Sequence, residues 1–402
     1  MTPTASQSAI HNPQSAIGER PKVAFIIHRY TADPGGGLER ICQLAAQQMK
    51  KYWRVEILTT CATDFTTWKN ELPAGAGEVN GLTVHRFAVD QERDPEAFRQ
   101  LCDHVLSGPT SPEKQEEWMR AQGPYSTALF DFIRDSKRNY ELFVFFGYLY
   151  ATTYFGIPLV KERAVLVPAA HDEPMLRLPI YGSVFAAARY VLWLTMEERR
   201  LVQRICGLEL PGEICGSGPG TLPVERLDTI DLKRPYLIYV GRIDHPKGCG
   251  ELLLFFSHSS QLPDLHLYLV GEPMMDIPRD ARIHALGRLK EGNKNWLLSQ
   301  AVALVMPSPY ESLSLVLLES WRFGVPVLVN GRCQVLKGQC ARSGGGIAYT
   351  DHRSFIGGAK ALVESPGYRA TLGIRGLRYV EKTYSWPEIE HSYLRAFQTA
   401  AR

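Results

Sequence analysis

The chain has 402 residues, of which 45% are hydrophobic and 22% are charged; this is the balance of a globular protein, and the length predicts two domains. A formal net charge of +3 is too small to indicate a nucleic-acid partner, so we expect none. The eight cysteines include no CxxC pair and no cluster with histidine at zinc spacing, so we expect free thiols, no metal site and a cytoplasmic protein.

The first half of the chain begins with a polar segment, residues 1–21, which lacks the apolar core of a signal peptide and predicts a disordered tail. A strand is predicted from Lys22 to residue 27, followed by a glycine-rich loop, a helix over 38–52 and a second strand over 54–60. This strand–helix–strand order predicts a parallel sheet. Further strands are predicted at 82–87, 142–146 and 164–169, with polar helices between about 90 and 140.

Residues 141–160 form an apolar run with a single formal charge, which is long enough to span a bilayer. Gly147, Gly156 and Pro158 interrupt this run, and tyrosines and threonines dilute it. A buried strand, a loop and an apolar helix therefore explain the run better than a membrane span does.

A second alternation of strands and helices begins near Pro235, with strands at 235–241, 266–271, 303–308 and 326–330 separated by helical segments. The pattern predicts an α/β fold with two Rossmann-like domains facing across a cleft. The N-terminal domain is expected over 22–210 and the C-terminal domain over 211–384, because the segment 208–223 is rich in glycine and proline. A last helix is expected over about 385–402, capped by Ser385.

Gly35, Gly36 and Gly37 lie between the first strand and its helix. Glycines there allow a ligand to approach the backbone, and the helix that follows offers free N–H groups to an anion. A plain tight turn explains the same residues, and the spacing does not match the GxGxxG pattern of a dinucleotide site.

Arg242 and Lys247 follow the strand at 235–241. Both cations could converge on a diphosphate and stabilise its negative charge without a metal. The alternative is that they are two solvated surface cations.

Glu311, in the loop after the strand at 303–308, and Glu319, eight residues later, are predicted to lie on nearly one side of a helix. Carboxylates at such positions accept hydrogen bonds from the vicinal hydroxyls of a sugar or a ribose. His171, just after the strand at 164–169, faces the predicted cleft and could contact a sugar, although a lone histidine is more often structural.

These motifs, in this order along the chain, resemble glycosyltransferase family 4, the retaining group 1 enzymes of the GT-B fold. The likeness extends from Lys22 to about Arg402. It implies an acceptor-side N-terminal domain joined by the last helix, and a C-terminal domain that binds a nucleotide sugar. It also implies transfer to a glycan, lipid-linked or small-molecule acceptor, with retention of configuration and with neither a metal nor another cofactor.

The resemblance also implies roles for individual residues. Glu311 would bind hydroxyls of the donor sugar, Glu319 would bind the ribose, and His171 would reach the transferred sugar. Arg242 and Lys247 would hold the diphosphate. The remaining donor-binding residues are Gly36 and Gly37 at the diphosphate and acceptor, the amides of Ser312, Leu313 and Ser314 at the diphosphate, and Arg288 and Leu289 beside the base.

Two segments fit the family less well. The turn at 215–220 (CGSGPG) departs from the usual interdomain turn, and the basic segment 332–346 has no explanation from the sequence.

Rival hypotheses are a sugar-nucleotide hydrolase or epimerase on the same fold, and a non-catalytic subunit that binds a nucleotide sugar. A role in polysaccharide biosynthesis and a cytoplasmic location, with peripheral contact at the inner face of a membrane, agree with the family. A basic face containing Arg189, Arg199, Arg200 and Arg204 would suit such contact. A solvated helix surface explains these arginines equally well.

Overall fold

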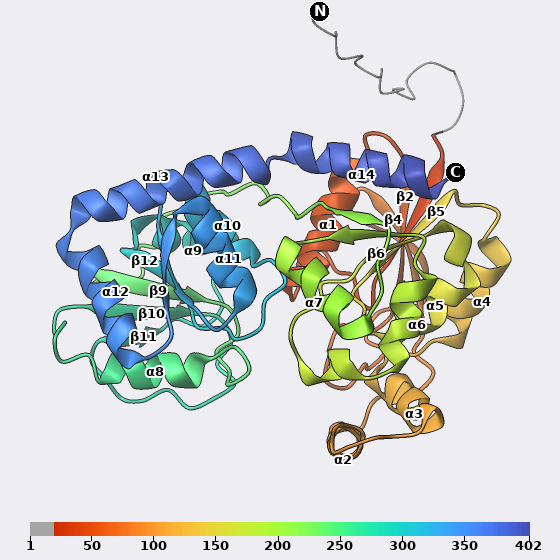
Figure 1. Ribbon diagram of the computed structural model, residues 1–402, viewed down its shortest axis with the longest axis horizontal. Helices are drawn as coiled ribbons and strands as arrows, with labels where there is room; N and C mark the ends of the chain where they lie inside the picture. Colours follow the sequence, from red (N-terminus) through yellow and green to blue (C-terminus); the bar gives the residue numbers. More distant parts are fainter. Residues whose placement is uncertain (1–19) are drawn as a thin grey trace, which may run out of the picture.

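The computed structural model describes residues 20–402. The predicted tail, residues 1–21, therefore lies almost entirely outside the described residues. Two lobes stand side by side, each built around one sheet, and a long helical segment runs along one side of both (Figure 1). All eight cysteines are free.

The first lobe contains an eight-stranded sheet in the order β3-β4-β2-β1-β5-β6-β7-β8. Every pair of neighbours is parallel except β3 and β4, which form a hairpin. The predicted boundary between 210 and 211 is wrong, because β8 pairs with β7 and so belongs to the first sheet. The strands are β1 (Lys22–Ile26), β2 (Arg54–Thr60), β3 (Gly75–Val79), β4 (Leu82–Phe87), β5 (Leu142–Phe146), β6 (Ala164–Val167), β7 (Tyr190–Trp193) and β8 (Gly212–Ile214).

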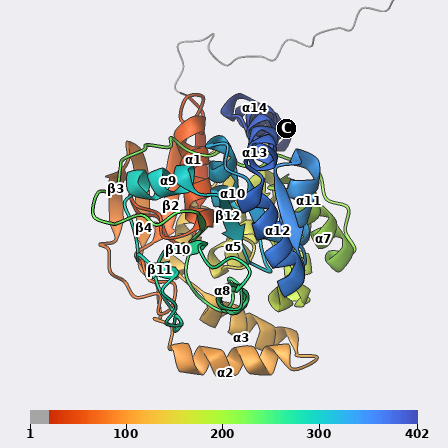
Figure 2. The ribbon, with the colours of Figure 1, turned by 90° about the vertical axis from the view of Figure 1, so that its left-hand side faces the viewer.

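Four helices of the first lobe, α2, α3, α4 and α7, begin at a residue whose side chain caps them. Asp94 accepts hydrogen bonds from the backbone at the start of α2, and the Ser111 side chain does the same for α3. In two perpendicular views α2 and α3 project from the lobe on the side opposite the long helical segment (Figures 1 and 2). The helices are α1 (Gly37–Met49), α2 (Pro95–Leu106), α3 (Pro112–Gln122), α4 (Thr127–Ser136), α5 (Ala151–Gly156), α6 (Ile180–Ala187) and α7 (Met196–Cys206).

The apolar run at 141–160 forms β5, whose five residues are all buried, followed by α5, as predicted. Within residues 20–402, no helix has both the length and the apolar character needed to cross a bilayer.

The second lobe contains a six-stranded parallel sheet in the order β11-β10-β9-β12-β13-β14. Its four inner strands, β10, β9, β12 and β13, are short and mostly buried apolar runs, as expected for a sheet covered on both faces. The strands are β9 (Tyr236–Val240), β10 (His266–Val270), β11 (Ile283–Ala285), β12 (Ala303–Met306), β13 (Val327–Asn330) and β14 (Gly346–Tyr349). The helices are α8 (Cys249–Ser257), α9 (Glu291–Gln300), α10 (Leu315–Arg322), α11 (Gln334–Ser343), α12 (His352–Glu364) and α13 (Pro366–Thr383).

The basic segment 332–346, which the sequence left unexplained, is mostly α11. Its Arg342 forms an ion pair with Glu197 at the start of α7 in the first lobe, with Nη2 3.0 Å from Oε2. One basic residue of this segment therefore serves the contact between the lobes.

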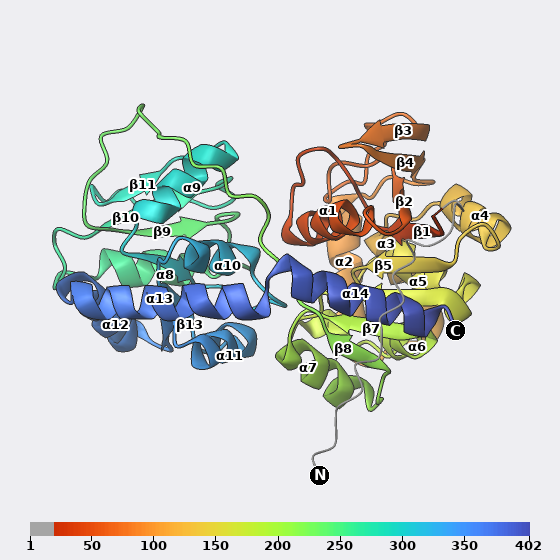
Figure 3. The same cartoon turned by 90° about the horizontal axis from the view of Figure 1, so that it is seen from above.

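The chain crosses between the lobes twice, and the two crossings contact each other. The first is the segment 215–220, and the second joins α13 to α14 (Trp386–Ala400). Trp386 donates its indole N–H to the carbonyl of Pro219 at 3.0 Å. Seen from above, α13 lies along the second lobe and α14 along the first (Figure 3).

The last helix, α14, returns to the first lobe and is held there by Glu390. This carboxylate accepts hydrogen bonds from Lys51 at 2.5 Å and from the Tyr52 hydroxyl at 2.9 Å. Ser385 occupies the N-cap position, but its side chain makes no capping hydrogen bond. The predicted place of the cap is therefore right and the predicted side-chain contact is wrong.

Gly216 in the first crossing is expected to tolerate no side chain. Its φ is +71°, and a Cβ there would lie 2.6 Å from the Tyr384 ring. We expect Gly216→Ala to lower the free energy of unfolding, measured in urea, by about 2 kcal/mol. Gly182, inside α6 with open space around a Cβ, is the control, and Gly182→Ala should raise stability by about 0.5–1 kcal/mol. If Gly216→Ala and the parent protein unfold at the same urea concentration, the close contact between residue 216 and the Tyr384 ring is wrong.

Candidate functional site

A cavity of about 210 Å³ lies between the lobes, where the carboxyl ends of strands from both sheets face each other. The first lobe contributes the start of α1 and the loops after β5 and β6. The second lobe contributes the loops after β9 and β12. The lining includes seven residues that the sequence singled out: Gly37, His171, Lys247, Glu311, Ser312, Leu313 and Ser314.

Lys247 and Glu311 form an ion pair at the wall of this cavity, with Nζ 2.9 Å from Oε1. The backbone N–H of Lys247 donates to Asp244 at 2.8 Å, and Arg242 lies 3.4 Å from the other oxygen of that carboxylate. The charge of Glu311 raises the pKa of Lys247, although burial acts in the opposite direction. The ammonium group therefore stays charged where an anion would enter.

The N-terminus of α10 also faces the cavity, through Ser312, Leu313 and Ser314. Thr195 of the first lobe donates its hydroxyl to the carbonyl of Ser312 at 3.0 Å and so fixes this loop. Ser314 has a φ of +72°, and its buried hydroxyl has no hydrogen-bond partner among residues 20–402. Free N–H groups at a helix start, next to a lysine, form an environment that suits a diphosphate.

His171 lies on the opposite wall, in the loop after β6. Its Nδ1 is 3.3 Å from Oε1 of Glu173, and its ring stacks on Tyr310 of the second lobe with 6.0 Å between the ring centres. Glu173 also accepts a hydrogen bond from the Tyr148 hydroxyl at 2.6 Å. The imidazole therefore lies between residues of both lobes, its Nδ1 has no hydrogen-bond partner among residues 20–402, and the sequence identified none of these neighbours.

Glu198, near the start of α7, holds the loop that carries His171. Its two oxygens accept the backbone N–H groups of Ala170 and Leu194, each at 2.6 Å. Complete burial raises the pKa of Glu198 to about 8, against the effect of these hydrogen bonds. Because Ala170 directly precedes His171, this carboxyl group fixes the path of the backbone into the cavity.

The glycine loop depends on a buried glutamate that sequence reasoning passed over. Oε1 of Glu39 lies 3.0 Å from His28 Nε2 and also accepts a hydrogen bond from Arg29. Burial alone would raise the pKa of Glu39, but His28 and Arg29 lower it to about 2. A Cβ on Gly36 would lie 2.5 Å from the other oxygen of Glu39, which explains the glycine there, while Gly37 lines the cavity.

Phe65, in the loop after β2, contacts two guanidinium groups, one from each lobe. The Arg242 guanidinium lies 5.0 Å from the centre of the Phe65 ring, and the Arg29 guanidinium lies 5.5 Å from it. Arg242 is therefore placed by an aromatic residue of the other lobe. Nothing in the sequence pattern connects these distant positions.

Several predicted residues do not line the cavity: Gly36, Arg242, Arg288, Leu289 and Glu319. Arg288 is 67% exposed and lies 3.8 Å from Glu272. The prediction that Glu311 and Glu319 share a helix side is wrong, because Glu311 precedes α10. Glu319 instead lies 2.8 Å from Lys294 of α9, a partner that the sequence did not reveal.

Lys294 remains charged next to Glu319. Burial lowers the pKa of Lys294, but the charges of Glu319 and Glu291 outweigh burial and raise it overall. In the region 20–402, no three His, Cys, Asp or Glu side chains are grouped as a metal site would require. Whether the reaction proceeds without a metal stays a prediction.

Comparison with known proteins gives a family match for part of the chain and a fold for the whole of it. Residues 226–373 match the family described as Glycosyl transferases group 1. Among solved structures, sucrose-phosphate synthase from Thermosynechococcus elongatus is 18% identical, with a TM-score of 0.69 over 95% of this chain and 100% of that one. WaaG, a glycosyltransferase involved in lipopolysaccharide biosynthesis, is 15% identical, with a TM-score of 0.62 over 93% and 99%.

HepE from Anabaena, solved in complex with UDP and glucose, is 12% identical to this chain. Its TM-score is 0.65 over 94% of this chain and 100% of that chain. At these identities the likeness concerns the fold, and in each case it extends over both lobes.

Proposed function

We propose that the protein transfers a sugar from a nucleoside-diphosphate sugar, on the premise that residues 226–373 match the group 1 glycosyl transferases and that the chain has the GT-B fold. The acceptor is a glycan, a lipid-linked sugar or a small molecule, and the configuration at the transferred carbon is retained. The observation that carries the proposal is the cavity in which Lys247, Glu311 and the start of α10 face His171 and Gly37.

In this proposal the diphosphate lies at the N-terminus of α10, next to Lys247. The donor sugar lies between Glu311 and His171, with the ribose toward Glu319 and the base toward Arg288 and Leu289. The solved complex of HepE with UDP and glucose makes UDP the first nucleotide to test.

The chemical step is a front-face substitution. The bond between the sugar carbon and the departing phosphate oxygen breaks, and the acceptor oxygen bonds to that carbon on the same face. The acceptor proton passes to the departing phosphate oxygen, while Lys247 and Arg242 stabilise the diphosphate charge. Glu311 forms an ion pair with Lys247, and Glu173 accepts a hydrogen bond from Tyr148; the proposed step uses neither carboxylate as a covalent nucleophile.

A panel of nucleotides in a thermal unfolding assay tests the donor site. We expect one nucleoside diphosphate to raise the unfolding temperature by several degrees, because a ligand at 100 times its Kd stabilises by about 2.7 kcal/mol. The matching monophosphate should shift it less, and EDTA should leave the shift unchanged. An unchanged unfolding temperature with every nucleoside diphosphate would count against the proposal.

The rival functions differ in what happens to the donor. A sugar-nucleotide hydrolase or epimerase consumes the donor without any acceptor, whereas a binding subunit leaves the donor intact under all conditions. Donor turnover that requires an added acceptor supports transfer over both.

We place the protein in polysaccharide biosynthesis on the cytoplasmic side of the membrane, and the involvement of WaaG in lipopolysaccharide biosynthesis is consistent with this. Arg189, Arg200 and Arg204 are exposed and available for peripheral contact with the inner face.

A further inference from the structure

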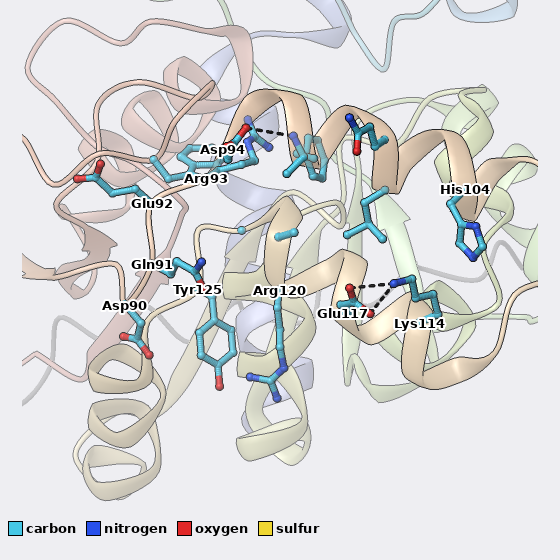
Figure 4. Close-up of a pocket in the computed structure, with 17 residues that line it drawn as sticks. Asp90, Gln91, Glu92, Arg93, Asp94, His104, Lys114, Glu117, Arg120 and Tyr125 are labelled. Carbon is cyan, nitrogen blue, oxygen red and sulfur yellow. Dashed lines mark hydrogen bonds and ion pairs between the residues drawn. The ribbon is translucent and has the colours of Figure 1, made fainter.

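A second and larger cavity, of about 770 Å³, lies in the first lobe between α2, α3 and the loop that precedes α2. Figure 4 shows side chains of both helices and of this loop around the space. Among the described residues, its lining has no member in common with the lining of the interdomain cavity. The proposed catalytic step uses none of the residues around it.

In the lining of this cavity, arginine guanidinium groups lie over aromatic rings. The Arg93 guanidinium lies 4.4 Å from the centre of the Phe98 ring, and the Arg120 guanidinium lies 4.5 Å from that of Tyr125. The charged groups are nearly balanced and comprise four acids and three bases: Asp90, Glu92, Asp94, Glu117, Arg93, Lys114 and Arg120. An anion would meet the surplus of carboxylates, and a bare hydrocarbon chain would leave the polar groups without partners.

A neutral sugar fits this lining better than either alternative. Its hydroxyls both donate and accept hydrogen bonds, as do the Gln91 and Gln100 amides that also line the space. Its C–H faces can contact the apolar surface of Phe98 and Leu101.

One layer of side chains separates this cavity from the reaction site. Trp68 lines the second cavity, and its ring lies 6.0 Å from that of Tyr150, which lines the interdomain cavity. Arg93 lies over Trp68 at 5.1 Å and donates hydrogen bonds to the carbonyls of Thr66, at 2.8 Å, and of Phe65. The Phe65 ring in turn contacts Arg242, so the second cavity adjoins the loop that places a donor-side cation.

We propose that this cavity binds neutral sugar units of a glycan acceptor, remote from the hydroxyl that receives the new sugar. The inference rests on the proposed transferase function and narrows its acceptor to an oligosaccharide. Sugar units bound there supply binding energy away from the reacting atoms, and that energy orients the acceptor for the chemical step.

Neighbouring positions of α2 offer matched variants. Ala97 is exposed and lines the cavity, so Ala97→Trp fills part of the space. Arg99 is exposed on the same helix but does not line the cavity, so Arg99→Trp adds the same ring elsewhere. A second pair removes side chains: Gln100→Ala with His104→Ala at the cavity, against Arg99→Ala with Asp103→Ala outside it.

The probes are maltotriose, cellotriose and tri-N-acetylchitotriose, titrated calorimetrically into the full-length protein with UDP and, separately, with GDP. We expect at least one trisaccharide to bind, and Ala97→Trp and the Gln100/His104 variant to weaken its binding by about tenfold or more. Arg99→Trp and the Arg99/Asp103 variant should bind as the parent protein does.

The proposal is overturned if no trisaccharide binds, or if Ala97→Trp binds as well as Arg99→Trp does. Binding restricted to trigalacturonate or to phosphatidylglycerol vesicles would overturn it too, because these probes are anionic. Nucleotide binding shows whether the acceptor proposal fails alone or together with the transferase proposal. If a nucleoside diphosphate binds and no trisaccharide does, this acceptor proposal alone fails. If no nucleoside diphosphate binds, the transferase proposal fails with it.

Discussion

Replacing Lys247 by alanine is expected to lower the kcat of sugar transfer by about 10²–10³-fold, the size of effect seen when one fixed donor to a developing negative charge is removed. The ammonium group faces the start of α10, and Glu311 keeps it charged. Arg242→Ala should also lower kcat, because Arg242 lies next to Asp244, the carboxylate that accepts the hydrogen bond of the Lys247 backbone.

Stability should change much less than activity in the Lys247 variant. The Lys247 side chain is 34% exposed in an open cavity, so water can solvate Glu311 once the ammonium group is gone. The measurements are steady-state kinetics and urea unfolding, with Lys360→Ala, at an exposed position of α12, as the control. Near-normal kcat in both the Lys247 and Arg242 variants would rule out the proposed charge stabilisation.

Glu39→Ala is expected to lower the free energy of unfolding by about 3–5 kcal/mol, because it leaves a buried cation without its partner. Glu39 is 5% exposed and binds both His28 and Arg29. Arg29 retains its hydrogen bond to the Thr63 carbonyl, at 2.8 Å, and its contact with the Phe65 ring, but it loses its carboxylate partner. Urea unfolding measures the loss, and Glu78→Ala on exposed β3 is the control.

The contribution of Glu39 should also depend on pH. The pKa of Glu39 is lowered to about 2 in the folded protein, against 4.5 for the unperturbed group. The stabilisation is therefore fully present above about pH 4.5 and is lost as the pH falls toward about 2. The stability difference between the parent protein and Glu39→Gln should be smaller at pH 3 than at pH 5. A difference that grows in acid would contradict the assigned charge state.

The fold could be predicted largely because buried parallel strands are continuous apolar runs. All residues of β5 and four of five in β1 are buried, and their order with the helices defines the two domains. The hairpin strand β3 was missed because its sequence, GAGEV, is almost entirely exposed and has no apolar alternation.

The candidate site could be predicted only where its residues belong to local motifs. Lys247 and Glu311 follow strands of one sheet, so their approach follows from the topology. Glu198 was missed because its partners are backbone N–H groups, which no side-chain pattern reveals. The contact of Phe65 with Arg242 depends on how two independent lobes meet, and periodicity carries no information about that. Assignment to family 4, within the group 1 enzymes, stays a prediction.

The two chain crossings limit how the lobes can move. Because the segment 215–220 and the α13–α14 junction touch through Trp386 and Pro219, their shared position defines a rotation axis along one side of the molecule. The displacement produced by a given rotation grows with distance from that axis. The regions that move furthest are thus α8 on one lobe and α2 with α3 on the other, opposite the crossings (Figure 1).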